Sequence, residues 1–239
     1  NNGFASLEDV PSDLLSKILL NHVISGTVNS TALTSAVSGY ATTMATNMDG
    51  DNLSLYFNTS SGLKFNGFSN VIKADLVAIN GIVHVINKVI GLPTVVTFTT
   101  ADPNFSTLVS ALTRDDLTSD FVSLLSTDLT TNPAPFTVFA PINEAFNGLL
   151  TELGITSLLD IDEPTLDAVL KHHVVGGANI LESDLTDNLT ITTLGGDITA
   201  NISGGASLTD SSGRVSEIIT VNIQANNGVI HAINKVILP

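Results

Sequence analysis

The chain contains no cysteine and no tryptophan, and only 8 of its 239 residues are Lys or Arg. Without thiols it forms no disulfide and has no thiolate nucleophile. The 23 Asp and Glu residues bring the formal net charge to −15 at pH 7, whereas nucleic-acid binding needs a basic surface. The same charge disfavours an anionic membrane surface. We therefore expect no nucleic-acid partner.

Long apolar runs and reactive motifs are also missing. No apolar stretch of roughly 18 residues occurs, so we expect no membrane insertion. No signal peptide is visible, and we expect any export signal to lie upstream of the sequence given. Nucleophile elbow, phosphate loop, dinucleotide and zinc patterns are absent. The sequence predicts no enzyme, no cofactor and no metal site, although 43% hydrophobic residues predict a packed core.

One phrase occurs twice. Asn80–Ile90 reads NGIVHVINKVI and returns as Asn227–Ile237, NGVIHAINKVI, and each copy continues into Leu-Pro. Asn-Gly is a strong hairpin signal, because both positions tolerate positive φ. The β-branched residues after it favour a strand, and proline ends a strand. The pattern predicts a hairpin turn at Asn80-Gly81 and Asn227-Gly228 and a tandem repeat.

A second match extends the repeat. Gly3–Val10 aligns without a gap with Gly154–Ile161, and His22 aligns with His173. Residues 1–93 therefore repeat the later part of residues 94–239. We expect two domains with these boundaries, of which the first is incomplete.

Each copy places helices before short strands, which predicts an α+β fold and not an alternating βαβ fold. In the first copy we expect residues 1–8 to enter a helix that Ser12-Asp13 caps and that continues through Leu14–Leu20, followed by a short helix over 31–37. Expected strands are 22–24, 42–48, 53–58, 64–68, 71–74 and 78–90, with a hairpin at Asp49-Gly50. In the second copy we expect an extended start at 94–99, helices over 105–112 and 120–125, a buried strand at 136–140 and a helix capped by Asn143.

The segment Thr137–Phe146, TVFAPINEAF, resembles the first signature block of fasciclin-type (beta-Ig-H3/fasciclin) adhesion domains. The closing phrase at Asn227–Pro239 resembles the second block. Between them the family usually has Tyr-His, a place held here by His172-His173. The matching positions, all expected to be mostly structural, are Thr137, Val138, Phe139, Ala140, Pro141, Asn143, Glu144, Phe146, His22, His173, Asn80, Gly81, His84, Asn227, Gly228 and His231.

The resemblance implies a β-wedge or sandwich of short strands with a helical layer, in two tandem copies. It also implies extracellular or cell-surface adhesion, by protein–protein or protein–glycan binding. Because neither copy has the Tyr of the Tyr-His pair, an integrin-binding role is not carried over. The acidic, cysteine-free composition fits a bacterial surface, secreted or periplasmic protein better than an animal matrix protein.

The histidines are the candidate site residues. His22 and His173 either form a ligand-contacting pair or are hydrogen-bonded residues that fix a helix-to-strand joint, which we favour. His172 and His173 are poor metal co-ligands, because adjacent side chains diverge. His84 and His231 point either outward to solvent or inward to hydrogen bonds.

Alternative functions remain open at this point. A carbohydrate or small-ligand binding protein of the cell envelope would need a pocket with convergent polar groups, and an exposed cluster of Tyr40, Tyr56 and Phe57 would favour it. A hydrolase would need paired carboxylates with shifted pKa values. The partner is an unidentified cell-surface protein or polysaccharide. The incomplete first domain also predicts self-association through an uncovered apolar surface.

Overall fold

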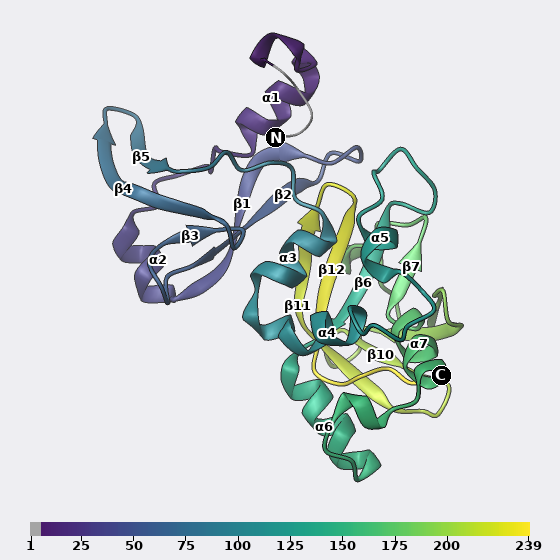
Figure 1. The fold of residues 1–239 in the computed structure, drawn as a ribbon. Coiled ribbons are helices and arrows are strands. Elements are labelled where there is room, and N and C mark those ends of the chain that lie inside the picture. The colour runs from purple at the N-terminus through teal and green to yellow at the C-terminus, as the bar shows by residue number, and fades with distance from the viewer. Residues whose placement is uncertain (1–5) are drawn as a thin grey trace. The chain divides into compact units, whose positions relative to one another are not determined.

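The computed structural model describes residues 6–239. Its contacts divide the chain into two compact units, Asn1–Pro93 (unit 1) and Thr94–Pro239 (unit 2) (Figure 1). The expected start of a helix at residues 1–5, and the repeated residues Gly3–Ala5, lie outside the described residues.

Unit 1 consists of a few short helices and one sheet. The elements are η1 (Leu7–Asp9), α1 (Ser12–Leu20), α2 (Ser30–Ala36), β1 (Ser38–Thr46), β2 (Asn52–Asn58), β3 (Lys64–Phe65), β4 (Ser69–Ala78) and β5 (Gly81–Ile86). The sheet is an antiparallel meander in the order β1-β2-β3-β4-β5. Strand β5 is therefore an edge strand among residues 6–239.

Most of the expected helices and strands of unit 1 are present, with shifted ends. The expected cap at Ser12-Asp13 is wrong, because Ser12 is already helical and Pro11 holds the N-cap position without a side-chain bond. The hairpin across Asp49-Gly50 is present. The side-chain oxygen of Asn47 accepts bonds from the backbone nitrogens of Asp49 and Asp51, at 2.9 and 2.8 Å, and orders this turn. The expected strand at 22–24 is reduced to one bridge between Ile24 and Thr43.

Unit 2 is larger and has more helix. The elements are α3 (Val95–Ala101), η2 (Pro103–Phe105), α4 (Ser106–Leu112), α5 (Phe121–Leu125), β6 (Phe136–Pro141), α6 (Asn143–Leu153), η3 (Leu158–Asp160), α7 (Glu163–Lys171), β7 (Val174–Gly176), η4 (Glu182–Asp184), β8 (Leu189–Thr192), β9 (Asp197–Asn201), β10 (Ser207–Thr209), β11 (Val215–Ala225) and β12 (Gly228–Ile233).

Seven strands form the sheet of unit 2, in the order β7-β6-β12-β11-β10-β9-β8. Strand β6 runs parallel to β12, with Gly228 opposite Phe136 and Ile233 opposite Pro141, and antiparallel to β7. Every residue of β6 and β12 is buried. The α+β class and the tandem organisation predicted from the sequence are confirmed, and the strand of the second closing phrase, β12, lies in the interior of its sheet.

The expected extended start of unit 2 is wrong, because Val95–Ala101 forms helix α3. The sequence there is rich in β-branched residues, which favour strands. The side chains and backbones of Thr94 and Thr97 bond each other reciprocally as a capping box and start the helix. Val95 and Phe98 are then buried on one face. Local capping and tertiary burial outweigh the strand propensity here.

Each unit has its own apolar core. The cluster in unit 2 includes Phe139, Ile198, Leu208 and Ile233, from β6, β9, β10 and β12. The cluster in unit 1 is smaller and consists of Leu33, Leu55, Phe57, Phe65 and Ile90. No element corresponding to β6 lies beside β5 among the described residues of unit 1.

Candidate functional site

The first signature block lies on β6 and the start of α6. Thr137 is fully buried, and its hydroxyl donates to the carbonyl of Ala178 at 2.9 Å and accepts from the nitrogen of Ile180 at 2.8 Å. Val138, Phe139, Ala140 and Pro141 are also buried. These positions are internal and present no reactive group to solvent.

Asn143 does not cap its own helix, contrary to the sequence expectation, since Ile142 occupies the N-cap position of α6. Its carboxamide oxygen accepts from the backbone nitrogen of Thr107 at 2.9 Å and from the hydroxyl of Ser106 at 3.2 Å. Its amide nitrogen donates to the carbonyl of Pro103 at 2.9 Å. Asn143 therefore ties α6 to the beginning of α4.

Glu144 and Phe146, the remaining residues of the first signature block, have roles set by their positions in helix α6. Glu144 lies exposed in the first turn of α6, where a negative charge is favoured by the helix dipole. Phe146 is buried on the inner face of the same helix. Neither side chain is arranged for chemistry.

His173 follows the C-terminal end of α7 and is 2% exposed. Its Nδ1 donates to the carbonyl of Val169 at 2.7 Å, and its Nε2 accepts from the nitrogen of Ile237 at 3.0 Å. This pair of bonds needs a neutral ring with the proton on Nδ1. Burial, followed by the nearby His172, lowers the pKa of His173 from 6.5 to about 4.

His22 repeats these bonds in unit 1. Its Nδ1 lies 2.7 Å from the carbonyl oxygen of Ile18, and its Nε2 accepts from the nitrogen of Ile90 at 3.0 Å. The side chain is exposed, however, whereas His173 is buried. Both histidines thus hold a helix end to the segment that follows the closing strand, which is the geometry of a structural joint.

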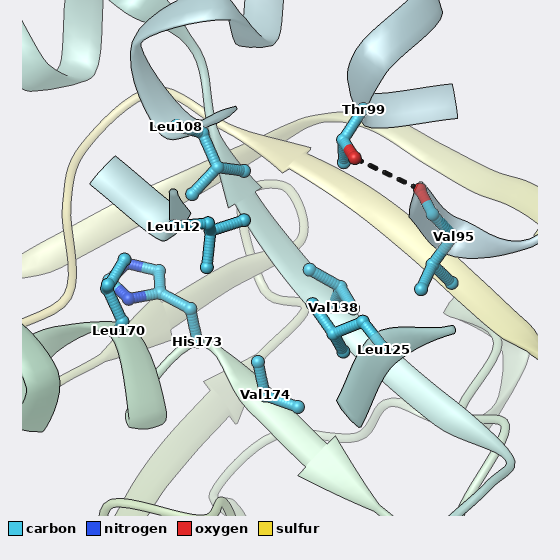
Figure 2. A pocket seen from close by; sticks show the side chains of 9 residues that line it. All are labelled: Val95, Thr99, Leu108, Leu112, Leu125, Val138, Leu170, His173 and Val174. Carbon is cyan, nitrogen blue, oxygen red and sulfur yellow. Dashed lines mark hydrogen bonds between the residues drawn. The ribbon is translucent and has the colours of Figure 1, made fainter. Parts of the chain in front are cut away.

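Figure 2 shows the cavity beside His173, lined by apolar side chains that include Leu108, Leu170 and Val174. The cavity volume is about 10 Å³, which is the space of about one water molecule. It is too small for a sugar or another organic ligand. The joint at His173 is therefore not the wall of a ligand pocket, whereas the equivalent His22 and also His84 line a groove of about 410 Å³ in unit 1.

His231 points inward, and His84 is half-buried. His231 is fully buried, bonds the carbonyl of Ile180 through Nε2 at 2.9 Å, and stacks on Phe139 with the ring centres 5.7 Å apart. Burial lowers the pKa of His231. His84 bonds the carbonyl of Val28 through Nε2 at 2.9 Å. Nothing in the sequence pattern points to Ile180, whose backbone nitrogen and carbonyl bond Thr137 and His231.

The Asn-Gly pairs are not the centres of the hairpin turns, contrary to expectation. Ala225 pairs with Gly228, so the turn residues are Asn226 and Asn227, and Gly228 begins β12. A Cβ at Gly228 would collide with the carbonyl oxygen of Phe136 and lie 2.8 Å from its nitrogen. Glycine is needed there because β6 approaches closely.

Asn227 is buried and has three partners in the leading half of unit 2. Its amide nitrogen donates to the carbonyls of Leu125 and Thr127, at 2.9 and 3.0 Å, and its oxygen accepts from the nitrogen of Val95 at 3.0 Å. The corresponding Asn80 is exposed, and Ala78 pairs with Gly81 across the same kind of turn.

In the described part of the chain, no cluster of three or more potential metal ligands occurs. His172 and His173 bond different carbonyls, those of Ala168 and Val169. The turn at Gly195 lies against the His172 ring. A Cβ on Gly195 would lie 2.7 Å from the backbone nitrogen of His172 and collide with its Nδ1.

The exposed aromatic cluster that would favour carbohydrate binding is not formed. Tyr56 and Phe57 are buried, at 1% and 7% exposure, so with Tyr40 they form no exposed stacking platform. The carboxylates of Asp162 and Asp187 accept local hydrogen bonds, which lower their pKa values. Within residues 6–239, no helix has both the length and the apolar composition to cross a membrane.

Sequence comparison finds a match to the fasciclin domain model over residues 1–93 and 103–239. An uncharacterized protein of Synechocystis sp. is 34% identical over 148 residues, which is 62% of this chain and 98% of that protein. A fasciclin-like arabinogalactan protein of Arthroderma benhamiae is 31% identical, over 75% of this chain and 38% of that protein. Human periostin is also 31% identical, over 79% of this chain and 21% of its own length.

Among solved structures, a domain pair of the insect cell adhesion molecule fasciclin I is similar, with a TM-score of 0.58. The match covers 95% of this chain and 81% of the solved chain at 17% identity. At that identity the similarity shows the fold alone.

Proposed function

We propose that this chain, which belongs to the fasciclin domain family, is an adhesion or matrix-interaction module that acts outside the cell or on its surface. The observation that carries the proposal is the internal role of the motif residues. Thr137, His173, Asn227 and His231 are buried and hydrogen-bonded within unit 2. The motif therefore maintains the fold, and recognition falls to the outer surface.

The relatives support the same reading. The similar domain pair comes from a protein described as a cell adhesion molecule, and a fasciclin-like arabinogalactan protein and periostin are among the related sequences. Since the chain spans 38% and 21% of the last two, their complete activities are not transferred. A non-enzymatic binding role is the part we carry over.

The net charge of each unit indicates which kinds of partner are favoured. Unit 1 has four basic and six acidic residues, a net charge of −2, whereas unit 2 has four basic and seventeen acidic residues, a net charge of −13. A partner with a basic face is steered toward unit 2 and an acidic polysaccharide is repelled. We propose a cell-surface or matrix protein as the partner, with a neutral glycan as the second candidate.

A bead assay tests this proposal. Beads coated with the chain are mixed with cells of the source organism, with unrelated cells and with isolated polysaccharides, at low and physiological salt. We expect saturable capture of cells that weakens as salt rises. Beads with Gly228→Ala, a change that disrupts unit 2, should lose capture, while beads with the matched Gly81→Ala should keep it.

Two outcomes contradict the proposal. Capture of polysaccharide in the absence of any protein or cell binding would favour a carbohydrate-binding protein instead. Capture that survives unfolding of unit 2 would show that no folded surface of that unit is involved.

A further inference from the structure

A groove of about 460 Å³ lies on the surface of unit 2, beside the antiparallel strands β10 and β11 (Figure 1). Its volume is within the range of about 300–1,000 Å³ that is typical of binding sites. One wall is the turn of residues 203–206, and the other includes Val215, Glu217 and Ile219 of β11. The groove is distinct from the small cavity beside His173, which other residues line.

A β-bulge places an apolar side chain in this groove. The register of β11 against β12 shifts between Ile218 and Thr220, and Ile219 is the extra residue. Bulges re-aim side chains and are frequent beside functional sites. Ile219 is 49% exposed, whereas isoleucine is usually buried. Together with Val215, at 51% exposure, it gives the groove an apolar side.

Unit 1 has the same bulge with a different charge. The register of β4 against β5 shifts between Val71 and Lys73, and the extra residue Ile72 is 66% exposed. Asn70 stands at the position of Glu217, and a lysine follows the bulge. The exposed isoleucine therefore occurs in both units, whereas only unit 2 has a carboxylate at this position.

Glu217 holds its carboxylate at the groove. Its side chain is exposed, and its Oε2 accepts from the amide nitrogen of Asn234 at 2.8 Å. Its backbone nitrogen donates to the side-chain oxygen of Asn234, also at 2.8 Å. These bonds orient the carboxylate, which has lone pairs for further donors. No cation within residues 6–239 forms an ion pair with it.

The glycine turn that forms the other wall is held in place from below. The carboxylate of Asp187 accepts from the backbone nitrogens of Ile202 and Ser203, at 2.7 and 2.8 Å. A Cβ on Gly204 or Gly205 would meet nothing within 4 Å, so the backbone of the turn is open to a ligand. Because this wall is already ordered, binding against it costs little conformational entropy.

We propose that this groove binds a segment of a partner protein in which Lys or Arg stands beside aliphatic side chains. The cation pairs with Glu217, and the aliphatic groups cover Ile219 and Val215. The net charge of −13 on unit 2 steers such a segment to this unit. The inference rests on the proposed function, because it names the surface that a partner with a basic face would meet.

A glycan fits this groove less well than such a segment. Among the described residues that line it, none is aromatic, so a sugar has no ring on which to stack. An acidic polysaccharide would also meet the carboxylate of Glu217. The bulge isoleucine and the carboxylate together favour a ligand that is both apolar and cationic.

A peptide titration followed by nuclear magnetic resonance tests the proposal. The probe is a short synthetic peptide of alternating Arg and Val with blocked ends, added to the intact chain at physiological salt. We expect saturable shifts of the amide signals of residues 203–207 and 215–219. Two control peptides, in which Gln or Glu replaces every Arg, should give no saturable shifts there.

Matched variants separate the groove from the net charge. Glu217→Gln should weaken binding of the peptide about fivefold, the loss expected for one exposed ion pair. Glu144→Gln removes the same charge from the exposed first turn of α6, and the affinity should stay within about twofold. Ile219→Thr should weaken binding about tenfold, because apolar contact is lost. Ile72→Thr, at the equivalent position of unit 1, should have no effect.

Two results would overturn the proposal. Equal weakening by Glu217→Gln and Glu144→Gln would show that only the net charge of unit 2 attracts the peptide. Saturable shifts confined to other residues, or no saturable shifts at all, would show that the groove does not bind it.

The bead assay distinguishes a failure of this inference from a failure of the adhesion function. Beads that carry both Glu217→Gln and Ile219→Thr should lose most of their capture of cells. Undiminished capture by these beads would leave the adhesion function standing and overturn the role of the groove. Peptide binding at the groove without any capture of cells by unchanged beads would support the groove and contradict the adhesion function.

Discussion

The Nε2 atom of His173 accepts a 3.0 Å hydrogen bond from the backbone nitrogen of Ile237, 64 residues further along the chain. The bond holds the end of α7 to the segment that follows the last strand. It exists only while the imidazole is neutral, because a protonated Nε2 has no lone pair to offer. The stability of unit 2 is therefore linked to pH.

The first prediction concerns this pH dependence. The pKa of His173 is lowered from 6.5 to about 4 by burial and then by His172, so the unfolded state binds more protons between these values. Stability is complete above about pH 6.5 and falls by about 3 kcal/mol as pH drops through this window. In His173→Gln we expect the free energy of unfolding of unit 2 to decrease less over this pH range. The measurement is urea unfolding at each pH, monitored by hydrogen exchange of the amides of unit 2.

The matched control for that experiment is His22→Gln in unit 1. It should leave the pH dependence of unit 2 unchanged, because His22 belongs to the other unit. An unaltered slope between pH 6.5 and 4 in His173→Gln would show that other groups produce the acid sensitivity.

The second prediction uses the difference in burial between the two histidine joints. Removing the ring with His173→Ala leaves a cavity and an unpaired buried N–H, so the free energy of unfolding should drop by about 2–4 kcal/mol. His22→Ala should cost about 1 kcal/mol, since water reaches the exposed site.

Tyr40 and Tyr56 are the only tyrosines and both lie in unit 1. Tyrosine fluorescence therefore reports the unfolding of unit 1, and hydrogen exchange of the amides of residues 94–239 reports the unfolding of unit 2.

The third prediction compares two equivalent glycines. Gly228→Ala should destabilise unit 2 by about 4 kcal/mol or more, because the new methyl group collides with the backbone of Phe136. Gly81→Ala should change the stability of unit 1 by less than about 0.5 kcal/mol. Urea midpoints of the two variants check this. Equal effects would mean that the close approach of β6 is not what requires the glycine.

The fourth prediction concerns Asn143. Its carboxamide bonds to Thr107, Ser106 and Pro103 predict a loss of about 1–2 kcal/mol in Asn143→Ala. Asn143→Asp retains the acceptor and should lose less. The control is Asn147→Ala, an exposed position in the same helix, which should be near neutral. Thermal unfolding of unit 2 ranks the three variants.

The sequence predicts the repeated architecture of this chain better than its details. The doubled closing phrase and the helix-then-strand order were enough for the α+β tandem fold, because both are patterns of hydrophobic periodicity and turn residues. The helix at Val95–Ala101 is not predictable from residue preference, because its β-branched residues favour strands, whereas a threonine capping box and burial decide the outcome.

The errors at Asn143 and Gly228 have a common physical cause. The local preference of each residue type predicts a helix cap in one case and a turn residue in the other. In the structure each serves a contact with a distant segment, α4 in one case and β6 in the other. Such contacts leave no trace in local spacing. The histidine ambiguity likewise needed the coordinates, because spacing alone does not reveal which face of a strand is buried.

The place of β6 in its sheet also governs how the chain folds during synthesis. Its partner β12 lies almost at the C-terminal end of the unit, so this parallel pairing forms only after nearly all of the unit has left the ribosome. Unit 1, in contrast, pairs each strand with the next one along the chain. Its low contact order predicts that it folds early and quickly, while unit 2 folds late and depends more on chaperones.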